Sequence, residues 1–313
     1  MTPPTEPLEP TQSLAPHRVD LTGSDGLRLA ADEFGDPTGP PVVLLHGGGQ
    51  TRHAWGTTPR ALAERGWYVL RVDLRGHGES AWPDDGDYRL EAIASDVLAV
   101  AGAQASLPVL VGASLGGLAS LLAIGEADHD VARGLVLVDV APTIEQAGAQ
   151  RIGDFMAKNM ETGFGSLDEV ADAIAEYNPH RPRPKDLAGL RKNVRQREDG
   201  RWVWHWDPRF MSGPRGSRDE TRSVMLPPER LQDAARHVSV PTLLVRGKVS
   251  DLLSEEGAQE LLELVPHAEY VNVAGAGHMV AGDRNDLFND AIVGFLDRVR
   301  HAAGRPDGGA VLG

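Results

Sequence analysis

The sequence of 313 residues contains no cysteine. Without thiols the chain can form no disulfide bond, and it has neither a thiolate nucleophile nor a thiolate metal ligand. It also lacks an apolar run long enough to cross a bilayer, so we expect no contact with a membrane. Basic residues are also fewer than acidic ones, with 31 Lys and Arg against 45 Asp and Glu. The formal net charge of −14 argues against nucleic acid as a partner, because neutralisation of phosphates supplies much of that affinity.

The two ends of the chain differ in composition from the middle. Residues 1–16 hold five prolines and no apolar segment typical of a signal peptide, so they are expected to form a disordered arm. Residues 303–313 are rich in glycine and are expected to form a flexible tail. These features favour a cytoplasmic protein, either a monomer or a homodimer.

Between the ends, short apolar runs alternate with helical patterns. The runs are rich in Val and Leu and do not alternate with polar residues, which is typical of parallel strands buried on both faces. The sequence therefore predicts an α/β fold with helices on both faces of the sheet. Strands are expected at 18–23, 27–35, 41–47, 67–76, 107–114, 134–142, 241–247 and 268–275. Helices are expected at 59–66, 89–105, 115–127, 254–266 and 285–302.

The alternation is interrupted at 142–237. This stretch has helical patterns at 166–177 and 187–198 and no buried-strand run, which indicates a helical cap inserted over the strand ends. The core domain then comprises residues 17–141 and 238–302.

The stretch "LPVLVGASLGG" places a serine in a glycine-rich turn between a strand and a helix. Such a sharp turn lifts the Ser114 hydroxyl above the sheet, and residues two positions away must be small, as Gly112 and Gly116 are. Ligands of open α/β sheets bind at the carboxyl ends of the strands, where Ser114 is expected. A helix N-cap serine in an ordinary turn is the alternative interpretation.

A second glycine-rich segment, "HGGGQ", follows the strand at 41–47. Its backbone amides are expected beside the serine turn, and we assign Gly48 and Leu115 as donors to an oxyanion. A phosphate-binding loop is the alternative, but neither a Lys-Ser/Thr pair nor the GxGxxG spacing is present.

A serine nucleophile needs an imidazole to take its proton and a carboxylate to orient that imidazole. Asp251 follows one late strand and His278 follows the next, so both are expected at the same sheet edge as Ser114. The order Ser, Asp, His is the one this architecture uses. Asp139 also ends a strand and is the alternative acid, although lining the pocket or holding the adjacent loop is its expected role.

These segments resemble the α/β-hydrolase superfamily over nearly the whole chain. The matching pieces are "HGGGQ", "DLRGHGES", "GASLGG", "LVDVAP", "GKVSD" and "GAGH". The resemblance implies an eight-stranded, mostly parallel sheet with its second strand antiparallel and a helical cap after strand six. It implies Ser114 as nucleophile, Asp251 as acid and His278 as base, with neither cofactor nor metal. Similar members include epoxide-hydrolase-like proteins, which carry an aspartate at the serine position, and monoalkyl phthalate hydrolases.

The cap is expected to wall the pocket. Trp202, Trp204 and Trp206 alternate along an extended segment, so they form either an aromatic wall for the substrate or a small core of the cap. The basic run at 181–201 is either a solvated helix face or, through Arg191, Lys192 and Arg195, a site for an anionic half-ester. Substrate contacts are expected from Gly49, Asp139, Trp204, Trp206 and Met279.

The sequence thus favours a serine hydrolase that cleaves a small-molecule carboxylic ester through an acyl-enzyme. Lactone or thioester hydrolysis uses the same residues and stays open. A second class of function is the cleavage of a C–C bond, by hydrolysis or by lyase chemistry, on this scaffold. A third class is a ligand-binding receptor without catalytic activity.

Overall fold

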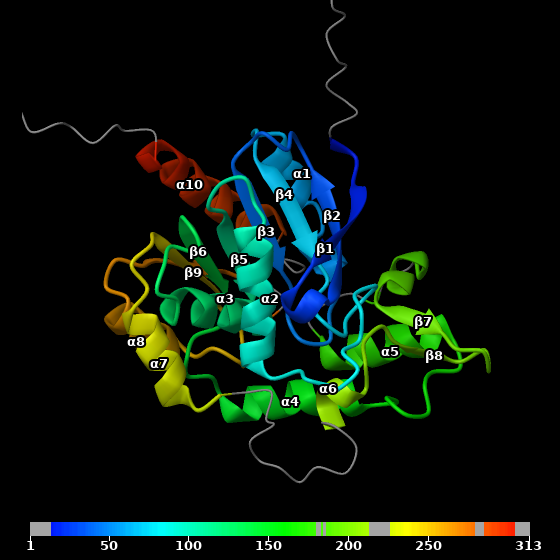
Figure 1. The fold of residues 1–313 in the computed structure, drawn as a ribbon. Coiled ribbons are helices and arrows are strands. Elements are labelled where there is room, and N and C mark those ends of the chain that lie inside the picture. The colour runs from blue at the N-terminus through cyan, green and yellow to red at the C-terminus, as the bar shows by residue number, and fades with distance from the viewer. Residues whose placement is uncertain (1–13, 180–182, 184–185, 213–225, 279–284, 304–313) are drawn as a thin grey trace, which may run out of the picture.

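Figure 1 shows the fold in a computed structural model, which describes residues 14–179, 183, 186–212, 226–278 and 285–303. Eight strands form one sheet in the order β1-β2-β4-β3-β5-β6-β9-β10. β2 runs antiparallel to both of its neighbours, and all other pairs are parallel. The predicted mostly parallel sheet is confirmed. Its strands are β1 (His17–Thr22), β2 (Arg28–Phe34), β3 (Pro41–Leu45), β4 (Tyr68–Val72), β5 (Val109–Ala113), β6 (Gly134–Val138), β9 (Thr242–Gly247) and β10 (Glu269–Val273).

Each central strand contributes to two apolar layers. In β3, Val43 and Leu45 face one layer while Val42 and Leu44 face the other, because successive side chains of a strand point to opposite faces. All four side chains are buried, which explains why the strand shows no polar alternation.

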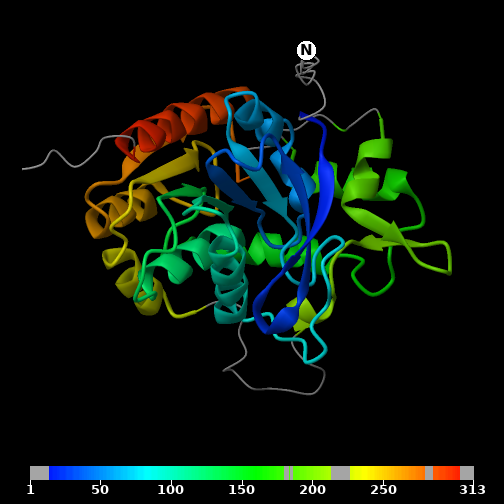
Figure 2. The same ribbon diagram turned by 45° about the horizontal axis from the view of Figure 1, so that its top comes forward.

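Helices cover both faces, as Figure 2 shows. One face is covered by α2 (Leu90–Gly102), α3 (Leu115–Gly125), α7 (Pro228–Arg236) and α8 (Glu255–Leu264). The other is covered by α1 (Thr58–Ala63) and α10 (Asn285–Ala303). Among the residues that the structure describes, no helix combines the length and apolar character needed to span a bilayer.

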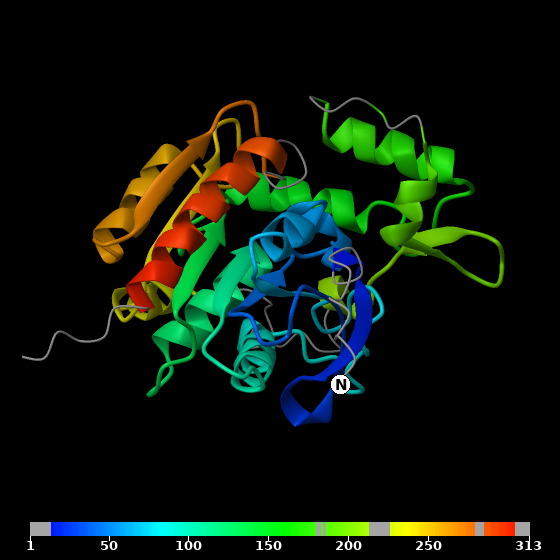
Figure 3. The same ribbon diagram turned by 90° about the horizontal axis from the view of Figure 1, so that it is seen from above.

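The insertion between β6 and β9 lies against the end of the sheet at which the parallel strands finish, as Figures 1 and 3 show. The predicted helix at 166–177 is confirmed, and the Ser166 hydroxyl caps it by accepting from the Glu169 amide. The insertion contains α4 (Gln146–Ala157), α5 (Leu167–Tyr177), the 3₁₀ helix η4 (Ala188–Lys192), β7 (Val194–Gln196), β8 (Trp202–Trp204) and α6 (Arg209–Ser212), followed by α7.

The prediction of a helix at 187–198 is wrong. Its residues form η4 and then β7, which pairs with β8 in an antiparallel hairpin. Gly200 closes the hairpin with a φ of 81°, and the Arg197 amide donates to the Arg201 carbonyl. Pairing with the tryptophan strand outweighs the helical pattern of the segment.

The last helix of the insertion, α7, packs on the core helices α3 and α8. It lies against α3, where a β-carbon on Gly125 would come within 2.2 Å of the Ala234 carbonyl oxygen. Helix α7 therefore lies on the same face of the sheet as α3.

Candidate active site

Ser114 occupies the turn between β5 and α3 in a strained conformation. Its φ of 46° and ψ of −115° lie outside the regions that L-residues favour, at a cost of about 1–3 kcal/mol. The neighbouring glycines make this turn sterically accessible. A β-carbon on Gly112 would lie 2.4 Å from the Gly116 carbonyl oxygen, and one on Gly116 would lie 2.3 Å from the Leu45 carbonyl oxygen. The turn therefore presents a half-buried serine at the carboxyl end of a central strand.

His278 follows β10, and its ring is oriented by Asp139. The distance from His278 Nδ1 to Asp139 Oδ2 is 2.8 Å. Because a carboxylate only accepts hydrogen bonds, Nδ1 carries the proton and donates, which leaves Nε2 as the free acceptor of the neutral ring. The Asp139 carboxylate is fully buried, and its other oxygen accepts the Gly247 amide at 2.9 Å. The structure thus brings together one imidazole and one buried carboxylate, with Asp139 in the position of the acid.

The prediction of Asp251 as the acid is wrong in geometry. Asp251 Oδ2 lies 2.6 Å from Arg151 Nη2 in α4, and both side chains are partly exposed. The two candidate acids follow the adjacent strands β6 and β9, but Asp139 comes directly after Val138, whereas Asp251 lies four residues past Gly247. Those extra residues turn the Asp251 side chain toward the cap.

The glycine loop after β3 lies beside the serine turn. A β-carbon on Gly47 would be 3.2 Å from Ser114 Cβ, and one on Gly48 would be 3.8 Å from Leu115 Cδ2. The Gly47 amide donates to Gln50 Oε1, but no acceptor for the Gly48 amide is found within the described part of the chain. Leu115 begins α3, so its amide has no acceptor in its own helix. Gly48 therefore lies beside the Leu115 side chain, and both residues line the cavity.

Two buried histidines, His46 and His77, hold this loop. His77 Nδ1 donates to the Arg75 carbonyl at 2.9 Å, and its Nε2 accepts the Gly49 amide at 3.1 Å. His46 likewise donates through Nδ1 to the Gly47 carbonyl and accepts the Leu74 amide. Each ring must be neutral to accept a hydrogen bond from a backbone amide. Burial, with the nearby His46, lowers the pKa of His77 to about 3, and burial also lowers the pKa of His46.

This burial predicts a loss of stability in mild acid. Between pH 6.5 and 3 the unfolded chain protonates His77 while the folded chain does not, so the free energy of unfolding falls as the pH falls. Urea denaturation measures this free energy of unfolding at pH 7.5 and at pH 5. Its decrease between the two pH values should be about 2 kcal/mol larger for the wild type than for His77→Gln. Equal decreases in the two proteins would contradict the buried, neutral imidazole.

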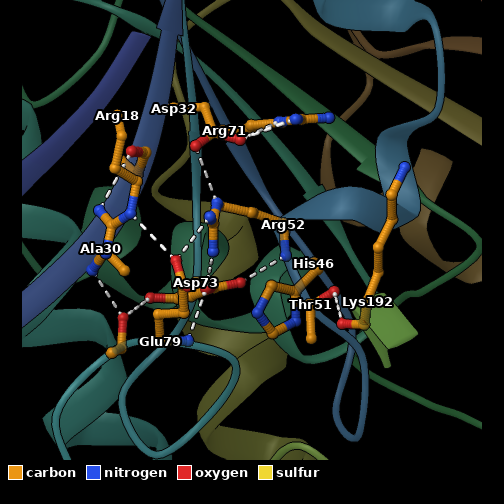
Figure 4. A network of polar contacts seen from close by, with 12 residues as sticks. Arg18, Ala30, Asp32, His46, Thr51, Arg52, Arg71, Asp73, Glu79 and Lys192 are labelled. Atoms are coloured by element: carbon orange, nitrogen blue, oxygen red, sulfur yellow. Dashed lines mark hydrogen bonds and ion pairs between the residues drawn. The ribbon is translucent and has the colours of Figure 1, made fainter. Parts of the chain in front are cut away.

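A buried ion network fixes the loops after β3 and β4 (Figure 4). Arg52 Nη1 lies 2.5 Å from Asp73 Oδ2, and its backbone amide donates to the other oxygen of the same carboxylate. The guanidinium also contacts Glu79 at 2.7 Å and Asp32 at 3.0 Å, and Asp32 pairs with Arg71. A buried charge network of this kind holds its backbone in one place when its charges are paired. It thereby supports the loops that carry the Gly48 amide and His77.

Ser114, His278 and the glycine loop open into one cavity of about 940 Å³ between the sheet and the cap. Its walls are mostly apolar, and Met156 of α4 reaches the glycine loop, where a β-carbon on Gly49 would lie 2.8 Å from Met156 Cε. Phe155 stacks on Tyr177 with ring centroids 4.3 Å apart. Apolar side chains from the core and the cap line the cavity, among them Leu115, Leu118, Val140, Ile152, Ile174 and Phe210.

The residues predicted to contact substrate divide between the cavity and its surroundings. Gly49 and Trp204 line the cavity. Trp206 is buried against Phe210, with ring centroids 6.3 Å apart, and Asp139 lies behind His278. Met279 falls outside the described residues. Trp206 is therefore packed in the apolar layer that also holds sheet residues, and Trp204 belongs to the wall, so the predicted set of substrate contacts is partly wrong.

Arg191, Lys192 and Arg195 do not share one helical face, because the first two lie in η4 and Arg195 lies in β7. The Arg191 guanidinium lies 4.9 Å from the Trp202 ring centroid, and that of Arg195 lies 4.5 Å from the Trp82 ring. Both contacts are cation–π interactions outside the cavity lining. Lys192 lines the cavity, as does Arg183, whose guanidinium is paired with two aspartates. The cluster of three cations predicted for an anionic substrate is thus dispersed.

The fold agrees with a comparison to known proteins. Residues 42–291 match the alpha/beta hydrolase family. The chain belongs to the alpha/beta hydrolase family. This α/β hydrolase is 31% identical over 264 residues to Esterase Rv0045c of Mycobacterium tuberculosis, a match that covers 82% of the chain and 83% of that esterase.

Two further comparisons extend the similarity. The α/β hydrolase is 29% identical over 259 residues to a 3-hydroxybutyrate-oligomer hydrolase of Cupriavidus necator, covering 80% of the chain and 87% of that protein. The crystal structure of E-2-(acetamidomethylene)succinate hydrolase superimposes with a TM-score of 0.76 at 24% identity, covering 90% of the chain and 100% of that structure. The match to the 3-hydroxybutyrate-oligomer hydrolase supports hydrolase activity, and the superposition shows the shared fold.

Proposed function

We propose that this α/β hydrolase cleaves carboxylic esters through an acyl-enzyme on Ser114. The observation that carries the proposal is the contact between Asp139 and His278, which leaves Nε2 unprotonated in a ring that lines the same cavity as Ser114. Similarity to an esterase supports the ester bond as the target.

In the proposed reaction, His278 Nε2 takes the hydroxyl proton as Ser114 Oγ attacks the ester carbonyl carbon. The negative charge that develops on the carbonyl oxygen is stabilised by the amides of Gly48 and Leu115. His278 then gives its proton to the departing alcohol, and the ester C–O bond breaks. Water, deprotonated by the same imidazole, releases the acid and restores the Ser114 hydroxyl.

The cavity walls favour a neutral substrate with an apolar acyl group. Ile152, Met156 and Trp204 offer no partner for a charged group, and a carboxylate is costly to remove from water without one. The lining contains Asp186 as well as Lys192, and Arg183 is already paired with two aspartates.

A matched pair of esters tests both the bond and the preference. We expect kcat/KM for p-nitrophenyl hexanoate to be at least about tenfold higher than for mono-p-nitrophenyl adipate, in which a carboxylate replaces the terminal methyl group. The ratio should vary little between low and high salt. No turnover of either ester would contradict the esterase proposal, and a salt-sensitive preference for the adipate would instead support the anionic substrate.

A further inference from the structure

Ser250 lies in the loop after β9, beside the carboxylate that orients His278. Its Oγ lies 2.5 Å from Asp139 Oδ2, the same oxygen that accepts from His278. A tight turn holds the residue in place, because the Ser250 amide donates to the Gly247 carbonyl at 2.9 Å. Ser250 is absent from the residues that line the cavity, so it contacts the carboxylate and not the substrate.

The direction of the Ser250 hydroxyl follows from its other contacts. Its oxygen accepts the Leu252 amide at 3.1 Å and the Leu253 amide at 3.3 Å. Two amide donors occupy the two lone pairs, so the single hydroxyl proton points at the Asp139 carboxylate, which can only accept. The hydrogen bond from Ser250 to Asp139 is therefore fixed in direction as well as in length.

We propose that Ser250 is a positioning residue that holds the Asp139 carboxylate in the orientation that His278 requires. Asp139 is fully buried, and within the described ranges no lysine or arginine forms an ion pair with it. Its donors there are the Gly247 amide on Oδ1 and, on Oδ2, the Ser250 hydroxyl and the His278 ring. Ser250 thus supplies the one side-chain hydrogen bond, apart from the imidazole itself, that keeps Oδ2 facing the ring.

Ser250 also connects this carboxylate to the cap. The next residue, Asp251, forms the ion pair with Arg151 of α4, and the Glu145 amide donates to the Leu252 carbonyl at 2.8 Å. A β-carbon on Gly148 would lie 2.1 Å from the Asp251 carbonyl oxygen, so the helix and the loop are in close contact. The loop that places the Ser250 hydroxyl is therefore held from the cap side.

The inference rests on the proposed function and predicts a change in kcat without a change in KM. For p-nitrophenyl hexanoate, Ser250→Ala should lower kcat about tenfold, because hydrogen bonds to charged groups are among the stronger ones, and leave KM within about twofold. Ser250→Cys keeps the size of the side chain but donates only weakly, so it should lose a similar factor. Ser250→Thr retains the hydroxyl and should restore most of kcat.

Ser254→Ala is the matched control. Ser254 lies in the same connection and its hydroxyl accepts the Gly257 amide at 3.2 Å as the cap of α8, without contact to Asp139. Ser254→Ala loses a hydroxyl oxygen, as Ser250→Ala does. It should lower the midpoint of thermal denaturation because the helix cap is lost, while kcat stays at the wild-type value. An equal loss of kcat in Ser254→Ala and Ser250→Ala would overturn the inference, because the effect would then come from the loop in general.

A double variant tests whether the effect passes through the carboxylate. Added to Asp139→Asn, Ser250→Ala should lower kcat no further. A full additional tenfold loss, or a wild-type kcat in both Ser250→Ala and Ser250→Cys, would overturn the positioning role. Failure of the proposed function is recognised separately, because it would leave Ser114→Ala active whatever the Ser250 variants do.

Discussion

Ser114→Ala is expected to abolish ester hydrolysis while the fold stays intact. The substitution removes the attacking oxygen, and loss of the serine of such a triad lowers kcat by a factor on the order of 10⁶. A residual rate from substrate binding and the oxyanion amides remains about 10³–10⁴ above that of water. Steady-state turnover of p-nitrophenyl hexanoate measures the loss.

Ser120→Ala is the matched control for this variant. Ser120 lies in the same helix, α3, and its buried hydroxyl donates to the Gly116 carbonyl at 2.7 Å without reaching the cavity. It should retain the kcat of the wild type. Retention of more than a few per cent of kcat in Ser114→Ala would exclude Ser114 as the nucleophile.

Asp139→Asn is expected to lower kcat by a factor on the order of 10⁴. An amide in place of the carboxylate can donate to His278 Nδ1, which moves the imidazole proton to Nε2 and leaves no base for Ser114. The same change at Asp251 should lower kcat less than about threefold, since it weakens only a partly exposed ion pair with Arg151. The two variants carry identical chemical changes, so each is the control for the other.

In the opposite ranking, Asp251→Asn would lose most of the wild-type kcat and Asp139→Asn would retain it. That result would restore Asp251 as the acid. In that case the ion pair with Arg151 would have to open during the reaction so that Asp251 could reach His278. The ranking of the two kcat values thus decides between the two carboxylates without any assumption about the substrate.

The strand pattern was sufficient to predict the sheet and the cavity-facing edge at which Ser114 and His278 lie. Parallel strands finish at one edge, so the residues that follow β5 and β10 lie at the same edge of the sheet. The glycines flanking Ser114 added a local steric requirement, and the structure shows the close backbone contacts that explain them. Both inferences rest on short-range chemistry and on the order of the strands.

The choice of acid and the shape of the cap depended on contacts between distant segments. Asp139 and Asp251 follow neighbouring strands, and only the partner Arg151, from a cap helix, shows which carboxylate turns away. The segment at 187–198 has helical composition, but pairing with the Trp202–Trp204 strand makes part of it extended. Ser250 carries no signal of its own in the sequence, because its role exists only through Asp139.

Covalent labelling tests the central claim most directly. Treatment of the wild-type protein with a p-nitrophenyl phosphonate, followed by mass spectrometry of the intact chain and its peptides, should show one added phosphonyl group, located on Ser114. Ser114→Ala should remain unlabelled, and Asp139→Asn should label far more slowly than Asp251→Asn. A label on another residue, or equal labelling of wild type and Ser114→Ala, would contradict a serine at position 114 activated by the imidazole at 278.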